Sequence, residues 1–121
     1  MELKRLENEL TVCKVASVDD VDLSGEFVFV GKTDEEISLV CETGSVPAGA
    51  IVREDGWRCF RIQGVLDFSL VGILAKITGV LAAEGICIFA VSTFNTDYIL
   101  VKEGDFDRAL DALAAVGYSV V

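Results

Sequence analysis

The second half of this 121-residue chain carries an ordered series of hydrophobic patterns that few folds can accommodate. Residues 57–63 alternate apolar and polar side chains, which is typical of a half-buried strand. Apolar residues then recur at helical spacing from Leu70 to Leu81. Gly85 follows at the position where a glycine commonly ends a helix. The pattern therefore predicts a strand followed by an amphipathic helix.

Two more strands, a second helix and a last strand complete the series. Residues 86–91 and 98–101 are short β-rich runs separated by a polar turn. Asp105 is a good N-cap for a helix that Gly117 would end, and residues 118–121 are again β-rich. This order predicts an α+β, ferredoxin-like fold, in which an antiparallel sheet carries two helices on one face.

Composition limits the partners of such a domain. Twenty acidic against ten basic residues give a net charge of −10, which repels phosphate backbones and anionic membrane surfaces. Lys76, Glu84 and Asp97 interrupt the apolar stretches, so none approaches the roughly 18 residues of a membrane span. The first seven residues lack the apolar run of a signal peptide. We therefore expect a cytoplasmic protein without nucleic-acid or membrane partners.

The four cysteines and the absence of histidine argue against catalysis and metal binding. Cys13, Cys41, Cys59 and Cys87 each lie in an apolar, strand-like run, and no C-x-x-C motif occurs. Without histidine the chain has neither a common zinc ligand nor a base that titrates near neutral pH. A glycine-rich phosphate loop is also missing. We expect buried, reduced thiols, no metal or cofactor, and no enzymatic activity.

An internal repeat indicates that the first half is a degenerate copy of the second. Shifting the chain by 61 residues places residues 27–42 on 88–103, and both segments read as strand, polar turn, strand and acidic exit. In the first half, residues 17–25 and 46–50 stand where helices would be, and both are too short for a packed helix.

The repeat also predicts the domain organisation. Residues 10–15 are expected to form the first strand of the degenerate copy, and residues 53–56 are expected to form a linker. We therefore expect a degenerate subdomain over residues 1–55 and an intact one over residues 56–121. A half of this size has too small a core to be secure alone, so the two are expected to pack together.

The second half resembles an ACT domain. Residues 57–64, 67–73 and 91–101 are similar to the small bacterial tandem-ACT proteins, which in turn are similar to aspartate kinase regulatory domains and CASTOR-type arginine sensors. The resemblance implies a module that senses amino acids and holds its ligand between two ACT subdomains. Where common ACT domains carry D-x-P-G, this chain departs, because Ser69 replaces the acid and Val71 the proline.

The first turn of the helix starting near Ser69 is a candidate site for a carboxylate. Unpaired backbone N–H groups and the partial positive charge of a helix N-terminus suit the carboxylate of an amino acid. Gly72 lacks a Cβ, so a ligand can approach the backbone there. Alternatively, Ser69 serves only as an N-cap and Gly72 only allows close helix-to-strand packing.

The polar turn after residue 91 offers acceptors for the positive end of a ligand. Asp97 ends this turn, and the 61-residue shift aligns Glu36 with it. Two acids at one cleft would suit arginine or lysine, although Asp97 is also a common turn former. The full set of expected ligand-binding residues is Ser69, Val71, Gly72, Ile73, Ser92, Thr93, Asp97 and Glu36.

These features predict a non-catalytic regulatory module that binds a small ligand, expected to be an amino acid, at the interface of its ACT subdomains. Its output would pass through a homodimer or a target protein. The alternative is a ligand-free module for dimerisation or protein–protein interaction, in which the ancestral pocket has closed. An open polar pocket would favour the first hypothesis, and apolar filling of the same place would favour the second.

Overall fold

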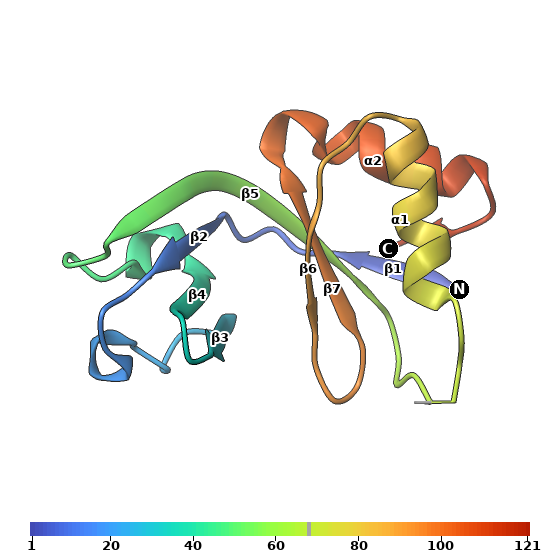
Figure 1. Cartoon of the computed structure of the whole chain (residues 1–121). Coiled ribbons are helices and arrows are strands. Elements are labelled where there is room, and N and C mark those ends of the chain that lie inside the picture. The colour runs from blue at the N-terminus through green and yellow to red at the C-terminus, as the bar shows by residue number, and fades with distance from the viewer. Residues whose placement is uncertain (68) are drawn as a thin grey trace. The chain divides into compact units, whose positions relative to one another are not determined.

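The computed structural model describes residues 1–67 and 69–121, which form two compact units (Figure 1). Unit 1 combines Met1–Glu7 with Arg58–Val121, and unit 2 is the continuous segment Asn8–Trp57. The long strand β5 (Val52–Ile62) contributes residues to both. The domain boundaries expected from the sequence stay a prediction, because compactness does not show that a segment folds independently.

Unit 1 has the α+β architecture that the sequence predicts. Its sheet contains β5 together with β1 (Glu2–Arg5), β6 (Phe89–Ser92), β7 (Asp97–Lys102) and β8 (Ser119–Val120). The strand β7 pairs with both β6 and β5, β5 pairs antiparallel with β1, and β1 pairs parallel with β8. The helices α1 (Ile73–Ala83) and α2 (Glu103–Ala115) share one core with the sheet (Figure 1). The ferredoxin-like fold is thus confirmed for this half.

The strand β1 is the element that the sequence patterns did not reveal. It lies between β5 and β8, the first and last strands of the predicted order, and it pairs antiparallel with β5 and parallel with β8. Leu3 is fully buried in the core of unit 1 beside Phe60 and Ile62. The first residues of the chain therefore complete the unit formed by its second half.

Unit 2 keeps the sheet of the fold and has lost both helices. Its strands β2 (Leu10–Lys14), β3 (Val28–Lys32) and β4 (Ile37–Glu42) join the start of β5 in the antiparallel order β3-β4-β2-β5. Two 3₁₀ turns, η1 (Val18–Asp20) and η2 (Thr43–Ser45), stand where the helices would be. The first copy is degenerate, as expected from the repeat.

The predicted linker at residues 53–56 is wrong, because these residues belong to β5. Arg53 and Glu54 pair with Cys13 and Val12 of β2. The side chains of Arg53 and Glu54 are exposed, so the segment has the polar composition of a linker. It pairs in the sheet through its backbone groups, and composition does not reveal such pairing.

The two β-hairpins of the repeat match at a shift of 60 residues, one fewer than the sequence alignment suggests. Lys32 pairs with Ile37, and Ser92 pairs with Asp97, so both turns contain four residues between the last paired positions. The strands that follow, β4 and β7, also share the same order of half-buried and buried positions.

Hydrogen bonds inside the two turns confirm this register. The Thr33 N–H donates to the Glu36 carbonyl at 2.9 Å, and the Thr93 N–H donates to the Thr96 carbonyl at 2.8 Å. Glu36 therefore corresponds to Thr96 and not to Asp97, which corrects the alignment used to pair the two acids.

Both predicted helix N-caps are wrong. Gly72 precedes α1 in the left-handed region with φ of 81°, and Lys102 precedes α2, and neither residue forms a side-chain cap. Ser69 is instead held in a local turn, in which its N–H donates to the Asp67 carboxylate at 2.8 Å. Asp105 lies inside α2, in its first turn, where a carboxylate still interacts favourably with the positive end of the helix dipole.

Both helices end as predicted, at glycines in the left-handed region. Gly85 and Gly117 have φ values of 71° and 107°. The N–H groups of these glycines donate to Ala82 and Ala114, which satisfies carbonyls of the last helical turn. None of the helices in the described part of the chain is long and apolar enough to cross a membrane.

The cysteines differ in accessibility, and the prediction that all four are buried fails for Cys87, which is exposed. Desolvation raises the pKa of Cys59 to about 12 and that of Cys41 to about 11, and it also raises the pKa of Cys13. Because the thiolate is the reactive form, these three thiols are expected to be inert in the folded protein.

We therefore expect a thiol reagent at pH 8 to modify only Cys87 in the native protein, and all cysteines after denaturation. The number of fast-reacting thiols can be measured by absorbance with a chromogenic disulfide reagent. The control variant Cys87→Ser should lose the fast phase. A fast phase that persists in this variant would show that a buried strand opens readily.

Candidate functional site

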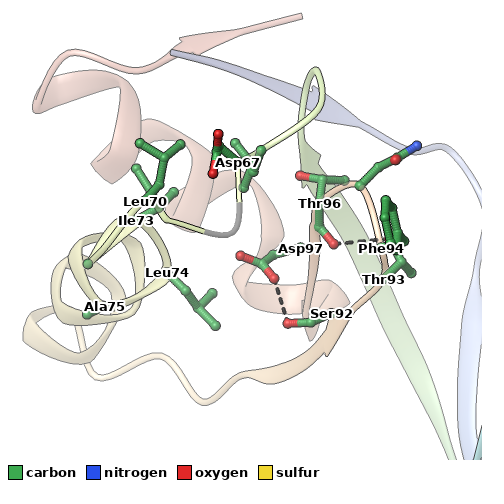
Figure 2. Close-up of a pocket in the computed structure, with 13 residues that line it drawn as sticks. Asp67, Leu70, Ile73, Leu74, Ala75, Ser92, Thr93, Phe94, Thr96 and Asp97 are labelled. Carbon is green, nitrogen blue, oxygen red and sulfur yellow. Dashed lines mark hydrogen bonds between the residues drawn. The ribbon is translucent and has the colours of Figure 1, made fainter.

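A pocket of about 380 Å³ lies in unit 1 between the loop that joins β5 to α1 and the turn that joins β6 to β7 (Figure 2). We call it the site pocket. Its lining residues are Leu66, Asp67, Leu70, Gly72, Ile73, Leu74, Ala75, Ser92, Thr93, Phe94, Asn95, Thr96 and Asp97.

The pocket brings together most of the residues that the sequence singled out. Five predicted ligand-binding residues line it, namely Gly72, Ile73, Ser92, Thr93 and Asp97. That they contact a ligand stays a prediction, because their common pocket shows only that they could do so together.

Three predicted residues lie elsewhere. Ser69 and Val71 belong to the loop before α1 but are not among the residues that line the site pocket, and Val71 is 93% exposed. Glu36 lies in unit 2, where it lines a different pocket at the β3–β4 turn. The prediction also omits Asp67, although an aspartate two residues before a serine is a common signal for a local turn.

Hydrogen bonds fasten the β6–β7 turn in place. The Thr96 hydroxyl is buried and donates to the Ile62 carbonyl of β5 at 2.8 Å. The Thr93 hydroxyl closes the turn by donating to the Thr96 carbonyl at 3.1 Å. One wall of the pocket is thereby held against the sheet.

The opposite wall is tied to this turn by the backbone. The Leu66 N–H donates to the Asn95 carbonyl at 2.7 Å, and the Leu70 N–H donates to the Asp67 carbonyl at 3.0 Å. Leu66 is therefore anchored on the hairpin, and a second backbone bond joins Leu70 to Asp67 beside the pocket.

The charged side chains of the pocket are both carboxylates. Asp67 and Asp97 line it, and no lysine or arginine does so among the described residues. The pKa of Asp67 is lowered mainly by a hydrogen bond from the backbone N–H of Ser69 and further by one from its side chain. The Asp67 carboxyl is therefore ionised at neutral pH. One oxygen of Asp97 accepts a bond from the Ser92 hydroxyl at 2.5 Å, and Figure 2 shows this carboxylate in the space between the turn and α1. The pocket is suited to a cationic group.

The start of α1 supplies groups of the opposite polarity. The first intrahelical bond runs from the Lys76 N–H to the Gly72 carbonyl, so the N–H groups of Ile73, Leu74 and Ala75 precede it. Because Gly72 has a φ of 81°, it turns the backbone into the helix with no Cβ in the way. An anion at this end of the pocket would meet backbone donors.

A family model described as "ACT domain" matches residues 52–115, slightly more than half of the chain. This chain belongs to the ACT domain family. A solved structure, protein Atu0741 from Agrobacterium tumefaciens, is 32% identical, with a TM-score of 0.87 over 99% of this ACT chain and 91% of that one. The regulatory subunit of aspartate kinase from Thermus thermophilus is 11% identical with a TM-score of 0.66, covering 95% and 96% of the two chains, and shares the fold.

Among curated proteins, this ACT domain is similar to the rat "Cytosolic arginine sensor for mTORC1 subunit 1". The two are 43% identical over 58 residues, which are 47% of this chain and 18% of the sensor. The chain thus matches less than a fifth of the length of that relative. Among the described residues of this ACT chain, no cluster of three or more acidic or cysteine side chains could hold a metal ion.

Proposed function

We propose that this chain is a non-catalytic regulatory module that binds a cationic amino acid in the site pocket. The observation that carries the proposal is the polarity of the pocket, whose lining combines two carboxylates with the open N-terminus of α1. An amino acid with a positively charged side chain needs both features at once. The 43% identity with a segment of an arginine sensor supports the same ligand class.

The α-carboxylate of the ligand would bind at the first turn of α1. The N–H groups of Leu74 and Ala75 belong to residues that line the pocket and carry the positive end of the helix dipole. Leu66 and Leu70 provide an apolar wall for the methylene groups of a long side chain.

The ammonium or guanidinium groups would bind on the side of the carboxylates. Asp97 keeps one oxygen beyond its bond with the Ser92 hydroxyl, and Asp67 is ionised. A charge-assisted hydrogen bond of this kind contributes about 1.5–3 kcal/mol. The arrangement favours arginine or lysine over neutral amino acids.

We further propose that the module acts in the cytoplasm and that its output passes through a second copy or a target protein, at an interface of ACT subdomains. The rat relative is named as a cytosolic sensor, which supports this location. Glu36 enters the proposal as a residue to be tested, since it belongs to unit 2 and lines another pocket there.

A ligand-free interaction module is the second candidate. Phe94 lines the site pocket and is 78% exposed, and Val65, next to the lining residue Leu66, is 74% exposed. Such a group of apolar residues is typical of a protein–protein contact. This candidate predicts no response to any amino acid.

Thermal unfolding in the presence of each standard amino acid separates the two candidates. We expect arginine or lysine to raise the melting temperature, since a ligand at 100 times its Kd adds about 2.7 kcal/mol of stability. Citrulline, which lacks the charge of arginine, and agmatine, which lacks the carboxylate, should each give a much smaller shift. If no amino acid shifts the transition, the interaction module is the correct function.

A further inference from the structure

Unit 1 contains a second pocket, of about 270 Å³, between the start of α1 and the segment that joins α2 to β8. We call it the α1–α2 pocket. Ile73 and Lys76 of α1 line it together with Val71 and Gly72, which precede the helix. The rest of the lining is formed by Met1, Val116, Gly117 and Tyr118. The proposed function makes no use of this pocket.

The charge of the α1–α2 pocket is opposite to that of the protein. The chain carries a net charge of −10, yet no aspartate or glutamate lines this pocket among the described residues. Lys76 is its charged side chain, and in the described part of the chain it forms no ion pair. Its Nζ atom lies 5.5 Å from the centroid of the Tyr118 ring, which attracts the ammonium through its π electrons. An unneutralised cation is therefore held at the pocket.

The remaining walls are apolar. Val71, Ile73 and Val116 line the pocket, and Val71 and Val116 are among the exposed large hydrophobic residues of the chain. Burial raises the pKa of Tyr118, so its hydroxyl remains a hydrogen-bond donor over the physiological range. A ligand with a small apolar body would cover the valines and leave its polar end near Lys76.

We propose that the α1–α2 pocket binds a small apolar monocarboxylate, such as a branched short-chain acid. The volume lies just below the 300–1,000 Å³ of ordinary ligand pockets, which restricts the ligand to a small molecule. A free amino acid fits less well, because its ammonium would meet Lys76 and find no carboxylate among the lining residues.

Titration of the ¹⁵N-labelled full chain with 4-methylpentanoate tests this proposal. We expect saturable shifts of the backbone amide signals of Lys76 and Gly117, and much weaker ones with the neutral 4-methylpentanamide or with L-leucine. Lys76→Met should weaken the affinity by about tenfold or more, because it removes a charge-assisted bond, and Lys76→Arg should largely retain it. Lys76 is exposed, so both variants are expected to fold.

Lys4→Met is the matched control, since Lys4 is exposed on β1 and lies outside the pocket. It should bind the acid as the unmodified protein does. The proposal is overturned if the acid causes no saturable shift, if the amide binds equally well, or if the two lysine-to-methionine variants lose affinity to the same extent. Because no amino acid is required as the ligand, failure here leaves the function of the site pocket unaffected.

Discussion

Replacing Asp97 by asparagine is expected to weaken the binding of arginine by about tenfold or more while leaving the unliganded protein as stable as before. Asparagine keeps the oxygen that accepts the Ser92 hydroxyl, so the turn should retain its structure. The substitution removes only the charge that would pair with the cationic end of the ligand. Isothermal titration of both proteins with arginine measures the change in Kd.

Two further variants locate the effect. Asp34→Asn removes an acid from the corresponding turn of unit 2 and should leave the affinity unchanged. Glu36→Gln tests the residue that the repeat first paired with Asp97, and the corrected register predicts little effect from it. Binding to Asp97→Asn with the original Kd would show that the site pocket is not where arginine binds.

Replacing Leu3 by alanine is expected to lower the free energy of unfolding by about 2–5 kcal/mol. Leu3 is fully buried, and β1 lies between two strands of unit 1, so the smaller side chain leaves a cavity that the sheet cannot readily close. Urea denaturation followed by circular dichroism measures the loss. For a domain of marginal stability this is among the largest effects that a single substitution can have.

The control for this experiment is Leu23→Ala in unit 2. Leu23 is 72% exposed, and its replacement should change stability by less than about 0.5 kcal/mol. Equal effects of the two substitutions would mean that β1 is not part of the folded sheet, and the topology of unit 1 would need revision.

The elements that sequence patterns revealed are those in which side chains repeat with a clear period. In α2 the buried residues Phe106, Ala109, Leu110 and Leu113 occupy one helical face, and this periodicity predicts the helix without knowledge of its neighbours. The strand β1 shows no such signal, because only Leu3 of its four residues is buried. Its partners β5 and β8 are also far away in the sequence, and long-range pairing leaves no local pattern.

In the site, too, residues with a local sequence signal could be predicted, and residues placed by long-range contacts could not. Gly72 could be identified because a residue without a Cβ lets a ligand approach the start of a helix, and Gly72 does line the site pocket. Asp67 was harder to identify, since alignment with the D-x-P-G motif drew attention to Ser69 as the replaced acid. The turn that brings Asp67 to the pocket depends on the Leu66–Asn95 backbone bond, which joins loop and hairpin and has no side-chain signature.

The adjacency of β1 and β8 has a consequence for folding during translation. Synthesis releases β1 first, whereas its partners in β5 and β8 emerge much later, β8 only with Ser119–Val120. Unit 2 is continuous in sequence, so its strands can pair before the last strand of unit 1 has been synthesised. The nascent chain therefore carries Leu3 uncovered until these partners have been made, and a chaperone that shields apolar segments could bind it during that interval.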